Sequence, residues 1–468
     1  MIGQFGVGFY SAFMVADKVT VESKAFGADT ANCWTSTGAD GYTLEPCDKA
    51  DCGTVITLHL KENTEEENYD EFLEPYRIQG LVKKYSDYIR YPIIMQMSHQ
   101  VPNPDKEGET VTEVADETLN SMVPLWRKAK SELKPEDYNA FYKQRFGDYE
   151  DPVDVMHFKT EGQATFDALL YIPKNPPFDY YTKEFEKGLA LYSNGVLIME
   201  KCPDLLPDHF SFVRGLIDSA DLSLNISREM LQHDHQLKII AKAINRKIKN
   251  ELTRMLKNER EKYEAFFKTF GVQLKFGVYA NYGAEKDDLK DLLLFRSSAG
   301  EGMMTLKEYV DGMAEGQDTI YYACGDTAEK IALLPQTDAV LSKGYQVLYL
   351  TDDVDEFALQ MLMEYDGKKF ANITKDDLNL ESEDEKKAME QKNADAKGLL
   401  DTMKEALGEE VSAVKFSGNL GSHAVCLSAE GYLSMEMEKV LSSMPGGGQG
   451  AKAQLVLELS LIHISEPT

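Results

Sequence analysis

The chain has 468 residues, of which 43% are hydrophobic, and this is enough for about three domains that each bury a core. Its 79 acidic and 50 basic side chains give a net charge of −29. Such a charge repels phosphate backbones and argues against a nucleic-acid partner. Six cysteines form neither a C-x-x-C pair nor a zinc-finger pattern, which favours reduced thiols and a cytoplasmic location. No apolar run reaches the roughly 18 residues of a membrane-spanning helix, so no membrane partner is expected.

The first element is a glycine-rich loop with the pattern G-x-x-G-x-G over Gly3–Gly8. Glycines let a backbone approach an anion, and the first N–H groups of a following helix add unpaired donors. A short buried helix is expected directly afterwards, over Tyr10–Ala16. The loop therefore suits a phosphate, although such a pattern taken alone is more often a tight turn without a ligand.

The first block of the chain has the pattern of an α/β layer. Alternating residues predict strands over Lys18–Lys24 and Gly53–Leu60, and the segment Phe72–Tyr91 is expected to be helical. Pro92 ends that helix, because proline disfavours helical geometry in the residue before it. Residues 98–123 are rich in charge, proline and glycine, so we expect them to form a linker.

A second block combines strand-like and helical segments. Alternating segments occur at Phe166–Pro173 and Leu191–Met199, and strand-like runs at Thr319–Ala323 and Tyr345–Leu350 predict a βα-type layer. A long amphipathic helix is expected to bury residues at four-residue steps. These residues are Ile240, Ile244, Ile248, Leu252 and Leu256.

The charged residues 381–398 are expected to be helical and to mark a second boundary. After residue 399 we expect a helix, two short strands, a Met-rich helix over Gly431–Met444 and a last strand over Gln454–Leu459. The Met-rich helix has an apolar stripe that suits promiscuous binding of apolar segments, although burial in a core is slightly favoured. The stripe contains Leu433, Met437, Val440, Leu441 and Met444.

Other polar groups have simpler explanations. Asp352 and Asp353 follow a predicted strand, and helix capping is favoured over catalysis. His233 and His235 lie two residues apart and face different directions on a helix, so both are expected to be solvated rather than metal ligands. The same holds for the acidic run Glu65–Glu67, and no metal site is expected within the chain.

Arg228 and Gln232 are four residues apart, so a helix would present both on one face. The charged guanidinium group of an arginine can bind a terminal phosphate through two N–H donors. If this arginine came from another domain, phosphate hydrolysis would depend on domain closure. The alternative is a surface arginine paired with a neighbouring carboxylate, which sequence chemistry alone favours.

Together, four stretches resemble the heat-shock protein 90 (Hsp90) chaperones, and in particular their bacterial HtpG branch. The resemblance runs from residue 2 to about residue 459. Its most specific stretches are Ile2–Ser11, Glu150–Pro152 with Glu161–Gln163, Ile172–Pro173 with Pro177–Asp179, and Asp221–Gln232.

The resemblance implies an α+β multidomain protein. Residues 1–97 would be the C-terminal half of a Bergerat-type (GHKL) ATPase α/β sandwich, and residues 98–123 the linker. An αβα middle domain over 124–380 would follow, then the charged connecting segment 381–398 and a truncated α+β C-terminal domain over 399–459. Residues 460–468 do not resemble the family, and we interpret them as a non-native tail.

The resemblance also implies site residues. The ATP-binding loop would comprise Gly3, Gln4, Phe5, Gly6, Val7, Gly8 and Phe9, with Thr54 at the floor of the pocket. Arg228 would reach the γ-phosphate of ATP, with Gln232 beside it in the same catalytic loop. Trp126 and the helix carrying Leu433, Met437, Val440 and Leu441 would face client proteins.

In that family the catalytic Glu, the magnesium-binding Asn and the adenine-binding Asp precede the glycine loop, and the helices that form the homodimer follow the last strand. We therefore interpret the chain as a fragment and expect residues 1–468 alone to lack ATP turnover, because water attack lacks its general base and metal ligand. The function implied for the parent protein is ATP-dependent remodelling of partly folded clients. The alternatives are another Bergerat-fold ATPase, such as a topoisomerase or mismatch-repair subunit, and a passive binder of unfolded proteins.

Overall fold

The structure, a computed structural model, describes residues 8–102, 110–222, 235–375, 378, 380, 383–418, 420, 423–443 and 452–460. Two compact units divide the chain. The first comprises Met1–Ile172, Glu186–Leu206 and Val213–Ala243, and the second comprises Pro173–Phe185, Pro207–Phe212 and Ile244–Thr468. Both contain helices and mixed sheets, which confirms the expected α+β multidomain class.

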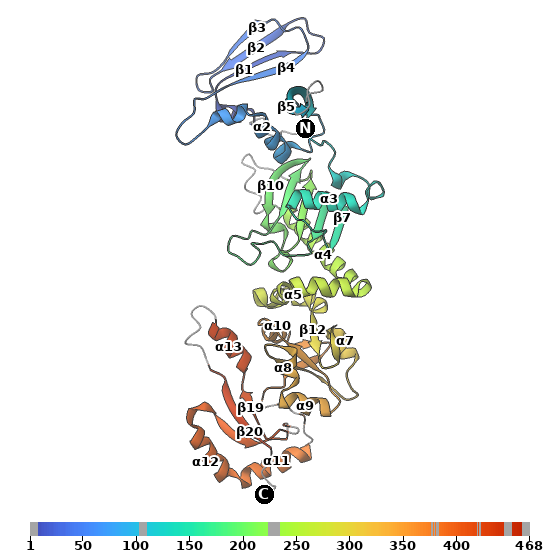
Figure 1. Cartoon of the computed structure of the whole chain (residues 1–468), viewed down its shortest axis with the longest axis vertical. Coiled ribbons are helices and arrows are strands. Elements are labelled where there is room, and N and C mark those ends of the chain that lie inside the picture. Colours follow the sequence, from blue (N-terminus) through green and yellow to red (C-terminus); the bar gives the residue numbers. More distant parts are fainter. Residues whose placement is uncertain are drawn as a thin grey trace. The chain divides into compact units, whose positions relative to one another are not determined.

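A four-stranded antiparallel sheet begins the first unit (Figure 1). Its strands are β1 (Ala16–Lys24), β2 (Ala31–Ser36), β3 (Thr43–Cys47) and β4 (Gly53–Leu60), in the order β3-β2-β1-β4. The two strands predicted here are therefore confirmed. The short buried helix expected before them is wrong, because this segment forms a 3-10 turn (Gly8–Ser11) and one α-helical turn, α1 (Ala12–Val15), without a buried residue.

The helix expected over residues 72–91 is shorter than predicted. A 3-10 turn covers Tyr69–Leu73, α2 covers Pro75–Leu81, and a π-helical turn covers Val82–Ser86. Pro75 has no N–H to donate to the preceding turn, so it begins a new helix instead of continuing one.

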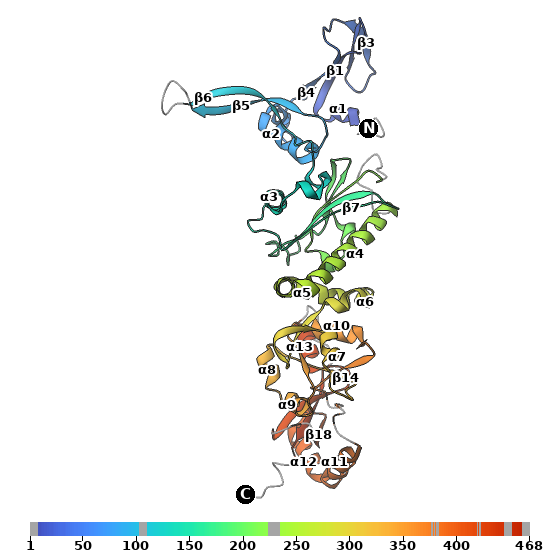
Figure 2. The same cartoon turned by 90° about the vertical axis from the view of Figure 1, so that its right-hand side faces the viewer.

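A β-hairpin takes up most of the predicted linker. Strands β5 (Ile94–Pro102) and β6 (Thr110–Thr118) pair in antiparallel register from Ile94↔Thr118 to Pro102↔Thr110. Figure 2 shows them as a long two-stranded ribbon. The expectation of irregular chain at 98–102 and 110–118 is therefore wrong, because backbone pairing forms there although few apolar side chains are buried.

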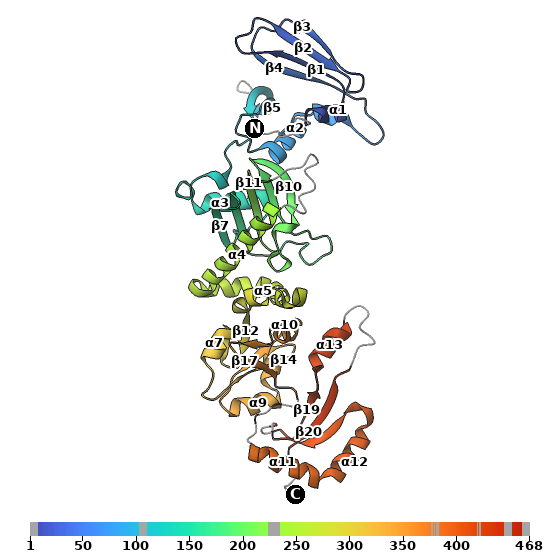
Figure 3. The ribbon, with the colours of Figure 1, turned by 180° about the vertical axis from the view of Figure 1, so that it is seen from behind.

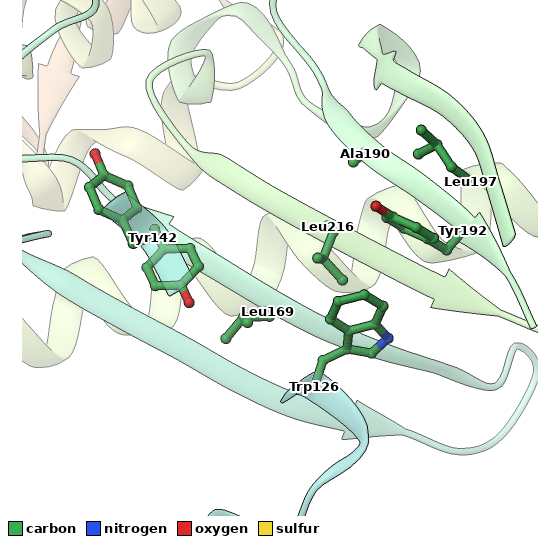
Figure 4. Packing of buried hydrophobic residues seen from close by; sticks show 8 residues of the cluster. Trp126, Tyr142, Leu169, Ala190, Tyr192, Leu197 and Leu216 are labelled. Carbon is green, nitrogen blue, oxygen red and sulfur yellow. The ribbon is translucent and has the colours of Figure 1, made fainter. Parts of the chain in front are cut away.

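A five-stranded mixed sheet forms the core of the first unit. Its strands are β7 (Asp154–Thr160), β8 (Phe166–Ile172), β9 (Leu189–Ser193), β10 (Val196–Cys202) and β11 (Arg214–Ser219), in the order β10-β9-β11-β8-β7. Helix α3 (Pro135–Phe146) contributes Tyr142 to the buried cluster on one face, where Trp126 lies beside Leu169 and Leu216 (Figure 4).

The alternating segment 191–199 proves to be two strands. A turn at Asn194 and Gly195, with φ of 53° and 80°, reverses the chain between β9 and β10. Glycine is required at the second position, because a Cβ there would lie 2.7 Å from the Tyr88 carbonyl oxygen.

Helix α4 (His235–Asn258) confirms the long amphipathic helix. Ile240, Ile244, Ile248 and Leu252 are fully buried, as their four-residue spacing predicts. The stripe then shifts to Met255, which is also fully buried, whereas Leu256 is only half-buried. Helical periodicity of 3.6 residues accounts for the shift, since four-residue steps drift around a helix.

A six-stranded sheet forms the core of the second unit, in the order β13-β12-β15-β14-β17-β16. The parallel pairing of β14 with β15 and β17 confirms the predicted βα-type layer. The sheet contains β12 (Leu294–Ser297), β13 (Gly300–Thr305), β14 (Thr319–Cys324), β15 (Val347–Leu350), β16 (Glu364–Tyr365) and β17 (Lys368–Asn372). Its helices are α5 (Arg260–Gly283), α6 (Lys286–Leu289), α7 (Leu306–Asp311), α8 (Ala328–Ala332), α9 (Pro335–Ser342) and α10 (Asp355–Leu362).

A smaller three-stranded sheet, ordered β18-β20-β19, follows in the second unit. It contains β18 (Ala413–Phe416), β19 (Val425–Glu430) and β20 (Gln454–Leu459), with helices α11 (Glu383–Asp395), α12 (Lys397–Leu407) and α13 (Met435–Ser443). Figure 3 shows α11 and α12 beside this sheet, and both pack against β18. The order of elements predicted after residue 381 is confirmed.

Candidate functional site

Aromatic contacts fix the end of the glycine loop to the first sheet. Gly3–Val7 lie outside the described residues, which begin with Gly8 and Phe9. The Phe9 ring meets the Trp34 ring of β2 edge-on at a centroid distance of 5.6 Å. A Cβ added to Gly8 would meet no atom within 4 Å, so this backbone is open to the approach of a phosphate. Nucleotide binding by Gly3–Phe9 stays a prediction.

Thr54 lies near the start of β4. Its Oγ1 is 2.9 Å from the Oγ of Ser23, which is its register partner in β1. Among the described residues no hydrogen bond joins Thr54 to Phe9, so its role at the floor of a nucleotide pocket stays a prediction.

Arg228 and Gln232 lie outside the described residues. The structure does show how the chain enters their segment. Asp221 Oδ2 accepts from the Thr165 N–H at 2.8 Å, Ser219 Oγ donates to the Thr165 carbonyl at 2.7 Å, and Leu222 is buried. The segment that carries Arg228 therefore starts from a fixed point at the end of β11.

Trp126 is an interior residue, so the expectation that it is exposed to clients is wrong for this structure. Only 1% of its surface is accessible. Its indole Nε1 donates to Asp218 Oδ2 at 3.0 Å, and Arg127 Nη2 reaches the same oxygen at 2.7 Å. A tryptophan is buried at low cost when its single donor finds such a partner.

The backbone of Trp126 is held as well. His157 Nε2 donates to its carbonyl at 2.9 Å, because a carbonyl can only accept. The hydroxyl of Tyr138 lies 2.8 Å from His157 Nδ1, which accepts in the neutral ring. The chain Tyr138–His157–Trp126 thus ties α3 to β7 and to the tryptophan.

Helix α13 presents the predicted client-facing stripe only in part. Leu433, Val440 and Leu441 are half-buried, whereas Met437 is 2% exposed. Gln360 Nε2 donates to Met437 Sδ at 3.0 Å. The expectation of an accessible Met437 is therefore wrong here, because this side chain packs toward α10.

Glu356, which no sequence pattern predicted as a site residue, holds the start of α13. The Ser434 hydroxyl donates to Glu356 Oε2, and the Met437 N–H in turn donates to Ser434 Oγ at 3.1 Å. Glu356 Oε1 also accepts from Asn372 Nδ2 at 2.8 Å and from the Tyr322 hydroxyl at 3.2 Å. One buried carboxylate thus links α13 to β14 and β17. The available signal was an acidic pair, Asp355–Glu356, shortly after the apolar run of β15.

A second contact fixes the middle of α13. Lys439 pairs with Asp326, which follows β14 and also pairs with Lys330 at 2.6 Å. The Lys330 and Lys439 ammonium groups lower the pKa of Asp326 to about 2. Between α13 and the ends of β14 and β15 remains a cavity of about 40 Å³, lined by Cys324, Asp352 and Val440 among others. A volume of this size is large enough for water but too small for a client side chain.

The capping role expected for Asp352 is wrong. Its carboxylate instead lies 2.7 Å from the buried Lys275 Nζ, and Asp355 Oδ1 lies at the same distance on the other side. The start of α10 has no side-chain cap, so the same expectation for Asp353 is also wrong. Asp355, in the first turn of α10, accepts through Oδ2 from the N–H groups of Thr351 and Asp352.

The histidine and glutamates expected to be solvated are exposed where the structure describes them. His235 and Glu65–Glu67 are exposed, and His233 lies outside the described residues. All six cysteines are free. In the described ranges no three His, Cys, Asp or Glu side chains cluster as metal ligands do, and no helix there is long and apolar enough to cross a bilayer.

Comparison with known proteins identifies the family. The profile described as "Hsp90 protein" matches residues 100–458, which include every strand from β7 to β19. The chain is 58% identical over 464 residues to the chaperone protein HtpG of Clostridium perfringens, covering 99% of this chain and 74% of that protein. It is 54% identical over 463 residues to the HtpG of Bacillus subtilis, with the same coverage. The chain belongs to the Hsp90 family.

Hsp90 membership confirms the resemblance read from the four sequence stretches. It also speaks against the alternative of a topoisomerase or mismatch-repair ATPase, since the relatives are HtpG proteins. The alternative of a passive binder of unfolded proteins stays a hypothesis. The site geometry adds the polar contacts at Glu356, Lys275 and Asp326, which no short motif indicated.

Proposed function

We propose that the parent protein of this chain is an HtpG-type chaperone, which binds partly folded client proteins in the cytoplasm and uses ATP to control that binding, and that residues 1–468 alone bind clients without ATP turnover. The observation that carries the proposal is 58% identity to an HtpG chaperone across 99% of the chain. Net charge of −29 supports protein clients over nucleic acid. By analogy with the family, the parent protein would act as a homodimer.

The proposed client surface comprises Leu433, just before α13, and Val440 and Leu441 on α13. All three are half-buried, and Tyr432, which precedes Leu433 in the chain, is 74% exposed. Apolar side chains that are partly accessible on one helix can receive an apolar client segment without unfolding of the host. Since the cavity behind the helix is small, the client would bind the outer edge of α13 or displace the helix from Glu356.

The proposed ATP site rests on the loop Gly3–Phe9 and on Arg228. Backbone N–H groups of the loop would bind phosphate oxygens, as open space above Gly8 allows. Arg228 would place its guanidinium on the terminal phosphate, and Gln232 would support that position. In the parent protein, ATP bound with magnesium would supply a phosphoanhydride bond whose cleavage removes the terminal phosphate from Arg228.

The chaperone proposal is tested by aggregation of a thermally unfolding client, followed by light scattering. The wild-type chain should suppress scattering in proportion to its concentration, and Leu433→Ser with Leu441→Ser should weaken suppression at least threefold. Val425→Ser is the matched control, because Val425 is 48% exposed in β19 and lies off the helix. Equal suppression by the α13 variant, or none by the wild type, would contradict the proposal.

The ATP part is tested separately by amide hydrogen exchange. Addition of ATP should slow exchange in residues 3–9, and Gly6→Val should abolish this protection because a side chain blocks the close approach of phosphate. Absence of ATP-dependent protection in the wild type would exclude the loop as a nucleotide site while leaving client binding untouched.

A further inference from the structure

A cavity of about 520 Å³ lies in the first unit, and none of the described residues that line it belongs to the glycine loop. It is bounded by the π-helical turn Val82–Ser86, by α3 and by the β9–β10 hairpin. Its volume is within the range of about 300–1,000 Å³ that is typical of pockets for small organic ligands.

One wall of this cavity is aromatic. Tyr88, Phe141 and Tyr192 line it, and Trp126 lies directly behind. The Trp126 ring is 4.5 Å from that of Tyr88 and 5.2 Å from that of Tyr192. These rings offer flat apolar surface to a ligand that is itself flat.

Most charges at the rim already have partners. Lys83 Nζ lies 3.0 Å from Asp87 Oδ1, and the same carboxylate accepts from the Ser121 N–H at 2.9 Å. Lys84 Nζ lies 2.8 Å from Glu200 Oε1. These pairs neutralise one another and leave little net charge for a ligand.

Arg145 is the exception at this cavity. Its side chain is half-buried and lines the cavity from the last turn of α3. Within the described ranges it makes no hydrogen bond and no ion pair. Burial raises the pKa of Tyr88 and of Tyr192, and the positive charge of Arg145 opposes this in both, so the guanidinium lies close to the two phenols.

We propose that this cavity binds a small aromatic molecule that carries one oxyanion group, a carboxylate or a phosphate ester. The oxyanion would pair with Arg145, whose planar fork matches two oxygens of such a group. The aromatic body would stack against Tyr88 and Phe141, which are half-buried, with the buried Tyr192 behind them. A bare inorganic anion would leave the aromatic wall uncovered, and a neutral ring would leave Arg145 unpaired.

Calorimetry with phenyl phosphate tests the proposal, alongside inorganic phosphate and phenol as the two half-ligands. Trp126 fluorescence gives a second readout in a Trp34→Phe background, because the chain has two tryptophans. The proposal expects saturable binding of phenyl phosphate that changes Trp126 emission, with each half-ligand at least tenfold weaker.

Arg145→Gln should raise the Kd for phenyl phosphate at least tenfold, because a charge-assisted pair is lost. Lys143→Gln is the matched control on the same helix. Lys143 pairs with Asp151 at 2.8 Å and does not line the cavity, so its substitution should change the Kd less than twofold. Circular dichroism of both variants establishes that they are folded.

Three results would overturn the proposal. These are no saturable binding to the wild type, an unchanged Kd in folded Arg145→Gln, and inorganic phosphate binding as tightly as phenyl phosphate. If a phosphotyrosine peptide bound tenfold more tightly than phenyl phosphate, the ligand of this cavity would be a peptide and not a small molecule.

Discussion

At the scale of single residues, Lys275 is the most constrained charge of the second unit. Its ammonium group is buried between Asp352 and Asp355, and the rings of Phe267 and Phe295 lie 5.6 and 5.0 Å away. Burial alone would lower the pKa of Lys275, but the carboxylates of Asp355 and Asp352 outweigh it and raise that pKa. The lysine is therefore charged in the folded protein and compensates the buried Asp355.

Removal of this charge should destabilise the second unit strongly. Lys275→Met leaves the fully buried Asp355 carboxylate without its partner, which costs about 3–5 kcal/mol of unfolding free energy at pH 7. Because burial raises the pKa of Asp355, protonation of this group in the variant should shrink the loss at pH 5. Urea unfolding at both pH values measures this, with the exposed Lys268→Met as control. A loss below about 0.5 kcal/mol, within the range of ordinary surface substitutions, would contradict the compensation argument.

The low pKa of Asp326 predicts how the stability of the fold responds to acid. Its pKa of about 2 in the folded state lies below the ordinary 3.8, so the unfolded state binds more protons between these values. Stability contributed by the Asp326 pairs is therefore fully present above about pH 4 and disappears as the pH falls toward 2. The stability difference between wild type and Asp326→Asn should be constant from pH 7 to 5 and then decrease. A difference that already decreases above pH 5 would point to another group.

At the scale of elements, α13 is tied to the larger sheet of its unit by side chains more than by a packed core. Ser434 and Met437 connect its first turn to Glu356 and Gln360, and Lys439 connects its middle to Asp326. In this part of the unit the helix thus depends on a few directional contacts. Such an element can open locally at lower cost than one held by a large apolar face.

Glu356→Gln should release α13 selectively. The Glu356 carboxylate accepts hydrogen bonds from Tyr322, Asn372 and Ser434. A glutamine amide has one oxygen that accepts and one NH₂ group that can only donate, so it cannot accept all of these bonds. Hydrogen exchange in residues 435–443 should accelerate at least tenfold, whereas exchange in β12 should change less than twofold. Uniform acceleration across the unit would mean that Glu356 supports the whole fold rather than this helix.

Periodicity predicted the regular elements well. The strands at 53–60 and 454–459 and the buried stripe from Ile240 to Leu252 all follow from residue spacing. Elements without an apolar pattern were missed. The hairpin β5–β6 is largely exposed, so charge and proline content suggested a linker, while cross-strand backbone pairing produced strands.

The candidate site was less predictable, because side chains distant in sequence form it. Glu356 meets Ser434 from 78 residues away, and the sequence offers no spacing that relates them. Trp126 was expected at the surface, yet Asp218, 92 residues later, satisfies its indole N–H in the interior. Burial of a polar aromatic residue depends on such a partner, which only the folded chain reveals.

At the scale of the whole molecule, the net charge of −29 should govern encounter with clients. Long-range attraction accelerates association with cationic partners and is screened beyond a Debye length of about 10 Å at 0.1 M salt. Association with a basic unfolded client should slow at least tenfold between 50 and 500 mM salt, measured by stopped-flow fluorescence. An acidic client of equal length is the control and should associate faster as salt rises. If the association rates of both clients depended equally on salt, charge would not be what steers association.

The path of the chain between its two units has a consequence for cleavage. Residues 173–185 and 207–212 belong to the second unit, although they connect strands of the five-stranded sheet in the first. A single protease cut within either segment would leave two fragments that each contribute strands to that sheet. The chain therefore cannot be divided there into independently folding halves, and a nicked protein would have to unfold this sheet before its pieces could part.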